Sequence, residues 1–286
     1  MSGWTCTDTA ALTRLKVQFM RKFENIKPVY SRKVRKVIEE NYRVKTIEIE
    51  HDMRDALPGQ FLMVWVPGEG ERPMSIGNSN PLTISVASVG KVSSKLHELR
   101  AGDMVSYRGP FGRPFRIPKD AKSMLVIGGG YGVVPMYFLA RVAKQNGMGV
   151  YSVVGGKTGK DIIWEKQLFT VSKEAFITTD DGSRGKKGTV MIEAEWLIGE
   201  KKIDQVYACG PEKMMLAAAK VCHDHGMPCQ VSVERHMKCG VGICGSCDIN
   251  GHLCCQDGPV FTGEEVLSMP DFGKRKRDAS GKNVDI

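Results

Sequence analysis

The sequence lacks any run of about eighteen consecutive apolar residues, the minimum for a membrane-spanning helix, so no membrane span is expected. It also lacks an N-terminal stretch of the kind that forms a secretory signal. Nine cysteines without such a signal favour a reducing compartment. We therefore expect a cytoplasmic protein whose thiols serve metal or redox chemistry.

The charge pattern does not support nucleic-acid binding. The formal net charge is +9, but aromatic residues are not interleaved with the basic ones, and no nucleic-acid-binding motif is present. The basic residues gather near the two ends of the chain, which is typical of a solvated surface or a docking face. No pair of side chains marks general acid–base catalysis either.

Four cysteines near the C-terminus have the spacing of a plant-type [2Fe–2S] site, C-x4-C-x2-C followed by a fourth cysteine. They are Cys239, Cys244, Cys247 and Cys255, although Cys254 is an alternative to its neighbour on spacing alone. Four thiolates must surround two irons, so the loop has to fold around the cluster. The intervening glycines reach the backbone angles that this requires, and their N–H groups can point at sulfur. These glycines are Gly240, Gly242 and Gly245.

Other uses of these cysteines stay open. Structural zinc is one, although zinc sites usually show two separated pairs, whereas three of these thiols fall within residues 239–247. Disulfides and inert thiols are the others. A zinc-bearing scaffold or nucleic-acid module would be colourless, whereas an iron–sulfur flavoprotein would be yellow-brown.

The first residues carry a weaker signal. Leu12, Leu15, Phe19 and Phe23 fall near helical spacing among basic residues. This pattern predicts either a basic amphipathic helix lying on a membrane or partner, or a loosely ordered extension. Strand-like sequence begins soon after Met20, which makes that methionine a candidate for the true start.

From about residue 28 the pattern is that of a small antiparallel barrel. Short runs of alternating or buried-strand type are bounded by Gly, Pro or Asn. We expect strands at 34–40, 42–51, 61–66, 82–89 and 104–108. Between the last two, residues 93–99 predict a capped helix, whose free N–H groups suit an anion.

After Pro118 strands alternate with helices, which predicts a doubly wound α/β domain whose ligands bind beyond the carboxyl ends of the strands. The expected strands are 123–127, 150–154, 175–179 and 205–208, and the expected helices end near 146 and span 164–171, 189–196 and 212–225.

Two glycine-containing turns follow strands of this domain, namely Gly128-Gly-Gly-Tyr-Gly132 and Cys209-Gly-Pro211. Both should lie at the same edge of the sheet, where a glycine backbone can approach a pyrophosphate. Taken alone, the first glycine run is weak evidence for a nucleotide-binding turn. It lacks the G-x-G-x-x-G spacing, no acidic residue follows about twenty positions later, and tight turns also use glycine.

Several motifs in a fixed order resemble the electron-transfer subunits of type B dihydroorotate dehydrogenase, which are related to ferredoxin reductases. The resemblance covers residues 28–268. It is carried by Arg72-Pro-Met-Ser75, Val126-Ile-Gly-Gly-Gly-Tyr-Gly-Val-Val-Pro135, Asp180-Asp-Gly-Ser183, Cys209-Gly-Pro211 and the closing Cys255-Gln-Asp-Gly-Pro-Val-Phe261. In the closing motif the ligand precedes x-Asp-Gly-Pro, which selects Cys255 over Cys254.

The resemblance implies a fold that is α/β plus β, with an FAD-binding antiparallel barrel, an NAD-binding α/β domain and a small C-terminal [2Fe–2S] module. The implied parts are an N-terminal extension, the barrel, the nucleotide domain, the cluster module and a basic tail, at residues 1–27, 28–118, 119–228, 229–270 and 271–286.

Site residues follow from the same resemblance. For the flavin they are Arg72, Pro73, Met74, Ser75, Ser85, Val86, Ala87, Val92 and Ser93. Those for the nucleotide are Gly128, Gly129, Gly130, Gly132, Asp181, Cys209, Gly210 and Pro211. Arg72 would pair with the pyrophosphate and Ser93 would add donors at the start of its helix. Ser75 by the flavin N5 and Cys209 near the nicotinamide are the candidate catalytic residues.

Two positions depart from common patterns. Met74 stands where many ferredoxin reductases place a tyrosine on the flavin ring, and Val92 stands where this branch often has glycine. On the residues alone, Arg72 is equally a surface cation and Cys209 a small buried thiol. Lys157 and Lys160 are either solvated lysines or contacts to a 2′-phosphate, so NAD over NADP rests on the resemblance.

In such a subunit, electrons arrive from a separate FMN-containing catalytic subunit that oxidises dihydroorotate in de novo pyrimidine (UMP) biosynthesis. They cross one [2Fe–2S] cluster singly, reach FAD and leave as hydride to NAD+. The implied assembly is a heterotetramer with two copies of each subunit. The cluster should then lie near the surface facing the partner, with His236 and Lys238 as candidate docking residues.

Two enzyme alternatives share these motifs: the flavin subunit of a sulfhydrogenase and the small subunit of a ferredoxin:NADP transhydrogenase. The run Lys274-Arg-Lys-Arg277 is a separate feature. It predicts a disordered, solvated tail, with a targeting or docking patch as the alternative.

Overall fold

A computed structural model describes residues 27–286 of the protein. The amphipathic helix or extension expected before that point, and the candidate start at Met20, lie outside these residues. Within them, no helix combines the length and the apolar character needed to cross a membrane.

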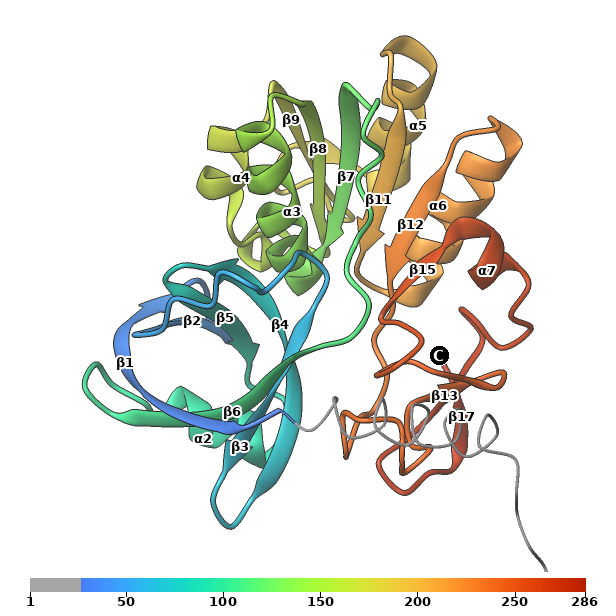
Figure 1. The fold of residues 1–286 in the computed structure, drawn as a ribbon. Coiled ribbons are helices and arrows are strands. Elements are labelled where there is room, and N and C mark those ends of the chain that lie inside the picture. Colours follow the sequence, from blue (N-terminus) through green and yellow to red (C-terminus); the bar gives the residue numbers. More distant parts are fainter. Residues whose placement is uncertain (1–26) are drawn as a thin grey trace, which may run out of the picture.

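The N-terminal part is a closed antiparallel barrel, at the lower left of Figure 1. Its strands follow the order β1-β2-β5-β4-β3-β6. They are β1 (Val29–Glu39), β2 (Val44–Ile49), β3 (Phe61–Val66), β4 (Gly70–Ser79), β5 (Leu82–Ala87) and β6 (Met104–Phe111). Along β6, Val105, Tyr107 and Phe111 are buried while their neighbours are more exposed, which is the period of two that places alternate residues in a core.

Two local features of the barrel differ from expectation. Strand β4, which carries Arg72-Pro-Met-Ser75, was not predicted, although it pairs with both β3 and β5. Helix α2 (Lys91–His97) begins two residues before Ser93. Ser93 therefore lies within its first turn, where its Oγ accepts hydrogen bonds from the N–H groups of Val89 and Gly90. The helix thus starts two residues earlier than predicted, while the role of Ser93 toward the flavin phosphates stays a prediction.

The second part is a seven-stranded sheet with the order β10-β9-β8-β7-β11-β12-β15. Neighbouring strands are parallel except for β12 and β15. The strands are β7 (Ser123–Gly129), β8 (Gly149–Gly156), β9 (Glu174–Thr179), β10 (Lys186–Lys187), β11 (Gln205–Cys209), β12 (Cys229–Ser232) and β15 (Val260–Thr262).

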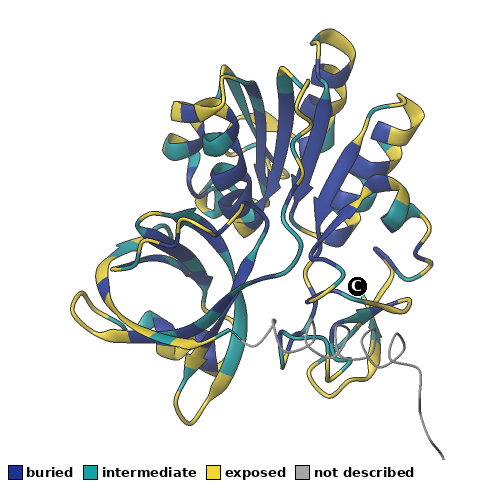
Figure 2. Ribbon diagram, viewed as in Figure 1, coloured by how far each residue is buried: buried dark blue, intermediate teal, exposed yellow. Residues whose placement is uncertain are grey.

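Helices cover both faces of this sheet, which Figure 2 shows as buried strands between helices with exposed outer sides. One core contains residues of α3 (Val133–Gln145) and α4 (Glu165–Val171). The other contains residues of α5 (Val190–Glu200) and α6 (Glu212–Asp224). Two cores on opposite faces of a mostly parallel sheet are the doubly wound arrangement expected from the sequence.

The cluster module is continuous with this sheet. Strand β12 pairs with β11 and β15 pairs with β12, so the boundary expected between residues 228 and 229 falls inside the sheet. Between them lie the cysteine loop and the hairpin of β13 (Asp248–Ile249) with β14 (His252–Leu253). Helix α7 (Gly263–Leu267) then packs beside α6.

The C-terminal segment is ordered, so the expectation of a disordered tail was wrong, although Lys274, Arg275 and Lys276 are exposed as expected. Strand β16 (Arg275–Arg277) pairs with β17 (Asn283–Asp285). Arg277 donates hydrogen bonds to the Gly245 carbonyl and to the Asp248 carboxylate, both at 3.2 Å. These two contacts attach the hairpin to the cysteine loop, an attachment that composition alone does not reveal.

Specific hydrogen bonds attach the barrel to the nucleotide domain. Trp164 Nε1 donates to Thr46 Oγ1 across the interface at 3.1 Å. Tyr42 Oη donates to Asp161 Oδ1 at 2.8 Å. Thr46 Oγ1 also bonds to Ser85 Oγ at 2.7 Å. Ser85 is one of the predicted flavin residues, so Thr46 connects the interface hydrogen bond of Trp164 to the predicted flavin site.

The interface hydrogen bond yields a stability prediction. Thr46→Val leaves the buried indole N–H of Trp164 without its acceptor, which should lower the free energy of unfolding by about 1–3 kcal/mol. Urea denaturation measures the change. Thr170→Val is the matched control, since Thr170 is exposed and its change should stay within about 0.5 kcal/mol. Equal midpoints for Thr46→Val and the unmodified protein would contradict the role of this bond.

Candidate functional site

A cavity of about 550 Å³ lies where the barrel, the nucleotide domain and the segment before the cysteine loop meet. This volume is in the usual range for a cofactor or ligand site. The predicted flavin residues that line it are Arg72, Pro73, Met74, Ser75, Ser85, Ala87, Val92 and Ser93. Val86 does not, because it points into the barrel core and is fully buried.

The cavity wall carries charge suited to a phosphorylated cofactor. Arg72 and Lys91 both line it. The Arg72 guanidinium donates to the backbone carbonyl of Glu71 at 2.7 Å, which leaves its other N–H groups for a ligand. A guanidinium can make forked contacts to a pyrophosphate. Apolar atoms of Phe61, Met74 and Val134 supply surface for a planar ring. The residues present thus fit a flavin dinucleotide.

Sequence reasoning missed the other two walls. Tyr131, from the first glycine turn, lines the cavity on the nucleotide side, and residues 232–237 line it on the cluster side. His236 belongs to this wall and is half-buried, whereas Lys238 is exposed; docking roles for both stay predictions. Their positions in the sequence could have identified these residues, since Tyr131 interrupts the glycine run and residues 232–237 join a strand to the cysteines.

Glu234 is the acidic member of that wall. Glu234 is exposed, with its side chain open to the cavity, and desolvation by the surrounding protein raises its pKa. The Glu234 charge, with burial, raises the pKa of Tyr131. Burial, with Glu234 adding to it, raises the pKa of Cys209. Cys209 is only 2% exposed and does not line the cavity. Catalytic roles for Ser75 and Cys209 stay predictions.

The two predicted nucleotide turns are in contact. Strands β7 and β11 pair in parallel, with Gly128 opposite Cys209. A Cβ on Gly132 would overlap the Cys209 carbonyl, and one on Gly129 would lie 2.8 Å from Pro211 Cδ. Gly130, with φ +55°, instead faces open space. Most of the run therefore serves close packing of the turns, while Gly130 leaves its backbone accessible to a ligand.

Other predicted nucleotide residues lie at the same edge of the sheet. Gly210 and Pro211 continue the turn after β11. Asp181 follows β9, with β8 between it and β7, and accepts hydrogen bonds from Ser183 N at 2.9 Å and Ser183 Oγ at 2.6 Å. Lys157 and Lys160 are exposed after β8. None of these residues lines the large cavity, so this part of the site is an open edge.

The cysteine loop, residues 239–247, has the geometry of a cluster-binding loop. Gly240, Gly242 and Gly245 have φ values of +72°, +75° and +68°. Backbone N–H groups point at sulfur, from Ile243 to Cys239 at 3.4 Å, from Gly242 to Cys255 at 3.2 Å and from Cys255 to Cys247 at 3.4 Å. Such N–H···S contacts stabilise thiolates and tune a cluster.

The electrostatics of the loop favours thiolates at particular positions. Burial opposes ionisation of Cys244, but hydrogen bonds with Ser246 and Cys239 outweigh it and lower its pKa to about 6. A hydrogen bond with Cys255 lowers the pKa of Cys247 to about 7. That same bond, with burial, raises the pKa of Cys255. The thiols are therefore hydrogen-bonded in pairs, Cys244 with Cys239 and Cys247 with Cys255. A lowered pKa favours the thiolate, which is the form that binds metal.

Cys254 is arranged differently from its neighbour. It is fully buried, which raises its pKa, and its thiol donates to the Val233 carbonyl at 3.3 Å, away from the other cysteines. Cys255 instead bonds to the loop through both its N–H and its sulfur. This geometry agrees with Cys255 as the fourth ligand. Across residues 27–286, no three His, Cys, Asp or Glu side chains are arranged to hold one metal ion.

The outer rim of the loop faces solvent. Cys244 is exposed and Ile243 is 83% exposed, whereas Cys247 and Cys255 are buried. A cluster held by these cysteines would therefore have an inner side toward the protein and an outer side toward a partner.

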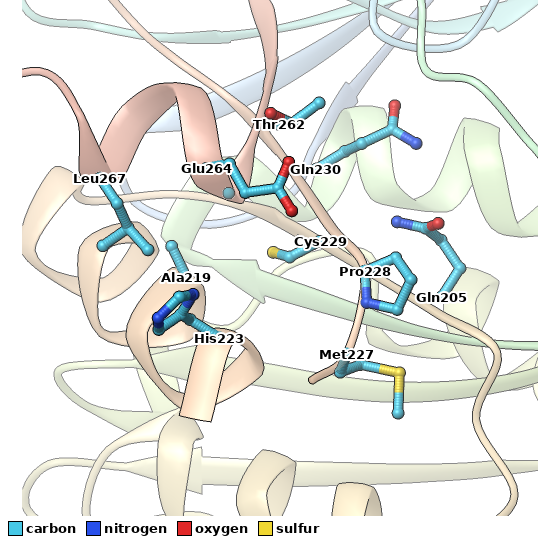
Figure 3. Close-up of a pocket in the computed structure, with 11 residues that line it drawn as sticks. Gln205, Ala219, His223, Met227, Pro228, Cys229, Gln230, Thr262, Glu264 and Leu267 are labelled. Carbon is cyan, nitrogen blue, oxygen red and sulfur yellow. The ribbon is translucent and has the colours of Figure 1, made fainter. Parts of the chain in front are cut away.

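A smaller cavity of about 150 Å³ lies between α6, β12, β15 and α7 (Figure 3). Gln205, His223, Cys229 and Glu264 are among its lining residues. None of the predicted site residues lines it, so it is separate from the flavin, nucleotide and cluster sites.

Known proteins match the same parts of the chain. Residues 234–267 match the family described as the iron–sulfur cluster binding domain of dihydroorotate dehydrogenase B. Residues 126–220 match the oxidoreductase NAD-binding domain.

Relatives match most of the chain. A protein of Methanocaldococcus jannaschii is 39% identical over 260 residues, which cover 90% of this chain and 98% of that protein. One from Methanopyrus kandleri is 40% identical over 228 residues, 79% of this chain and 86% of that protein. Both are named probable dihydroorotate dehydrogenase B (NAD(+)), electron transfer subunit.

Solved structures share the architecture. The structure of an NADH-dependent reduced ferredoxin-NADP oxidoreductase, described for flavin-based electron bifurcation, is 29% identical with a TM-score of 0.74. The match covers 82% of this chain and 88% of that one. The flavohem-like FAD/NAD binding domain of nitric oxide dioxygenase from Vibrio cholerae is 23% identical, with a TM-score of 0.60 over 69% of this chain and 93% of that one. The second match shows the fold alone.

Replacing the two neighbouring cysteines separately tests the ligand set. Cys255→Ser should abolish the cluster, because the sulfur that accepts from Gly242 N is lost. Cys254→Ser should retain it, since a hydroxyl can still donate to the Val233 carbonyl. Iron and sulfide content, with the visible spectrum, is the measurement. Cluster loss in Cys254→Ser with retention in Cys255→Ser would reverse the assignment.

The contact between the nucleotide turns can be tested by stability. Gly132→Ala should lower the free energy of unfolding by about 1–3 kcal/mol, because the new methyl group meets the backbone of Cys209. Gly199→Ala is the control. Gly199 lies in α5 with no atoms near a Cβ, so alanine there should be neutral or stabilising by up to about 1 kcal/mol. Equal effects of the two substitutions on urea denaturation would argue against close packing of the turns.

Proposed function

The chain belongs to the family of dihydroorotate dehydrogenase B electron transfer subunits, and we propose that it passes electrons from an FMN-containing dihydroorotate dehydrogenase catalytic subunit to NAD+. Its place is then in de novo pyrimidine (UMP) biosynthesis. The observation that carries the proposal is a single cavity with three walls. Predicted flavin residues form one wall, Tyr131 of the nucleotide turn forms another, and residues 232–237 before the cluster loop form the third.

Residues of the barrel would hold FAD in this cavity. Arg72 would bind the pyrophosphate, while Met74, Ser75 and Ser85, which also line the cavity, would contact the ring. When bound, a flavin supplies the exchange between one-electron and hydride chemistry. The protein needs no acid–base dyad for this electron exchange. Its residues would hold and orient the flavin and shield it from water.

The nucleotide edge would hold NAD. The open backbone at Gly130, together with the start of α3, suits a pyrophosphate. The nicotinamide end would then lie toward Tyr131, which lines the cavity as Glu234 does, and toward Cys209 at the paired turn. Asp181 follows β9 at the same edge and would lie toward the other end of the dinucleotide.

The cluster loop would hold one [2Fe–2S] cluster through Cys239, Cys244, Cys247 and Cys255. Support comes from the N–H groups aimed at these sulfurs and from the lowered pKa values of Cys244 and Cys247. The exposed rim at Ile243 and Cys244 is the side that a catalytic subunit would cover. We further propose a heterotetramer with two copies of each subunit in the cytoplasm.

A ferredoxin:NADP transhydrogenase subunit is the second candidate. The observation in its favour is the architecture shared with the NADH-dependent reduced ferredoxin-NADP oxidoreductase, at a TM-score of 0.74 and 29% identity. The two candidates differ in the partner protein and in the nucleotide.

Purification from the native host separates them. We expect the chain to copurify with an FMN-containing subunit, and the complex to oxidise dihydroorotate with NAD+ at least about tenfold faster than with NADP+. As a control, the isolated chain should reduce an artificial acceptor with NADH but leave dihydroorotate unchanged. A copurifying ferredoxin-linked subunit with a strong NADPH preference would favour the second candidate and contradict ours.

A further inference from the structure

The barrel reaches the cluster loop through one arginine. Arg108 on β6 forms a forked ion pair with Glu71 on β4, with Nε 2.9 Å from Oε1 and Nη2 2.5 Å from Oε2. The same Nη2 donates to the backbone carbonyl of Cys239 at 3.0 Å. Arg108 is therefore bonded at once to a barrel strand and to the first predicted cluster ligand.

The guanidinium has little freedom to move. Both side chains of the pair are about four-fifths buried, at 20% and 22% exposed. A forked arginine–carboxylate pair fixes orientation as well as distance. Arg108 also lies over the Phe111 ring, 5.5 Å from its centroid. The carbonyl of Cys239 thus accepts from a guanidinium that Glu71 and Phe111 hold in place.

A second contact brings the loop close to the barrel. A Cβ on Gly240 would lie 2.6 Å from Met63 Cγ, so only glycine allows this approach. Met63, on β3, is fully buried. The loop backbone therefore sits directly on the outside of the barrel strands, next to the point where Arg108 holds Cys239.

The same strands form the flavin wall. Glu71 directly precedes Arg72, which lines the large cavity. Phe111 packs against Phe61 with ring centroids 5.9 Å apart, and Phe61 also lines the cavity. One salt bridge therefore connects the strand that holds the flavin with the loop that holds the cluster.

We propose that Arg108 is a positioning residue that fixes the spacing between the cluster and the flavin, and so sets the rate of electron transfer between them. The proposal rests on the proposed function, because it presumes both cofactors. The rate of electron tunnelling falls steeply with distance, so a loop released from the barrel transfers electrons more slowly even when it keeps its cluster.

A purely structural role predicts a different outcome. If Arg108 only stabilises the fold, its loss lowers the unfolding free energy and leaves transfer unchanged in the folded protein. Transfer is observable by mixing the isolated chain anaerobically with NADH. One NADH gives a hydride to the flavin, and the cluster then takes one of the two electrons, so that flavin bleaching and cluster reduction appear as separate phases.

The test compares Arg108→Met and Arg108→Lys with Arg113→Met. Arg113 also bridges the barrel and the cluster module, but its partner is Glu265 at 3.6 Å and it does not contact the loop. We expect Arg108→Met to slow the cluster phase about tenfold or more, with the flavin phase unchanged. Arg108→Lys keeps the charge but not the fork and should be intermediate, and Arg113→Met should behave as the unmodified chain.

Amide hydrogen exchange at 241–243 gives a second readout that needs neither turnover nor cofactor. It should be faster in Arg108→Met than in Arg113→Met. A wild-type cluster phase in an Arg108 variant that retains cluster and FAD overturns the proposal. If Arg108→Met loses its cluster, the rate of the cluster phase in Arg108→Lys decides whether Arg108 has a positioning role. If the unmodified protein binds neither cluster nor FAD, the proposed function is contradicted. In that case the amide exchange still tests Arg108, and equal exchange rates at 241–243 in Arg108→Met and Arg113→Met would overturn its positioning role.

Discussion

The one constraint on which the arrangement depends is that three separately built parts of the chain must meet at a single cavity. The barrel contributes Arg72 and Ser75, the first turn of the sheet contributes Tyr131, and the segment after β12 contributes Glu234. Parallel strands bring the two nucleotide turns to one edge, where Gly132 packs against the Cys209 carbonyl. Strand β12 then leaves that same edge toward the cysteines, so the cluster loop begins where the nucleotide site ends.

Buried charge holds this junction together. Arg235, within the cavity wall formed by residues 232–237, forms an ion pair with Glu212 at the start of α6, and both side chains are almost fully buried. Glu212 also accepts from the N–H of Gly273 at 3.0 Å, which ties in the C-terminal segment. Removing one partner would leave an uncompensated buried charge, which is strongly destabilising. With Arg108 and Arg277, three arginines anchor the cluster module to the barrel, the sheet and the C-terminal hairpin.

Sequence reasoning predicted the barrel, the alternation of strands and helices after Pro118 and the cysteine loop, because periodicity and motif spacing are local signals. It missed β4, where Pro73 and two glycines, Gly70 and Gly77, obscure the strand pattern. Order in the C-terminal segment was missed because it depends on Arg277 reaching Gly245 and Asp248, which lie far away in sequence. The charged cavity residue Glu234 was missed because charged side chains are mostly exposed, and only the fold shows that this one faces a cavity.

We propose that the flavin, the nucleotide and the cluster form one continuous electron path within this chain. An electron paramagnetic resonance spectrum of the purified chain, equilibrated anaerobically with excess NADH, tests this path. We expect a bleached flavin together with the rhombic signal of a reduced [2Fe–2S] cluster in the same sample. A bleached flavin with a cluster that stays silent, or a colourless protein loaded with zinc, would contradict it.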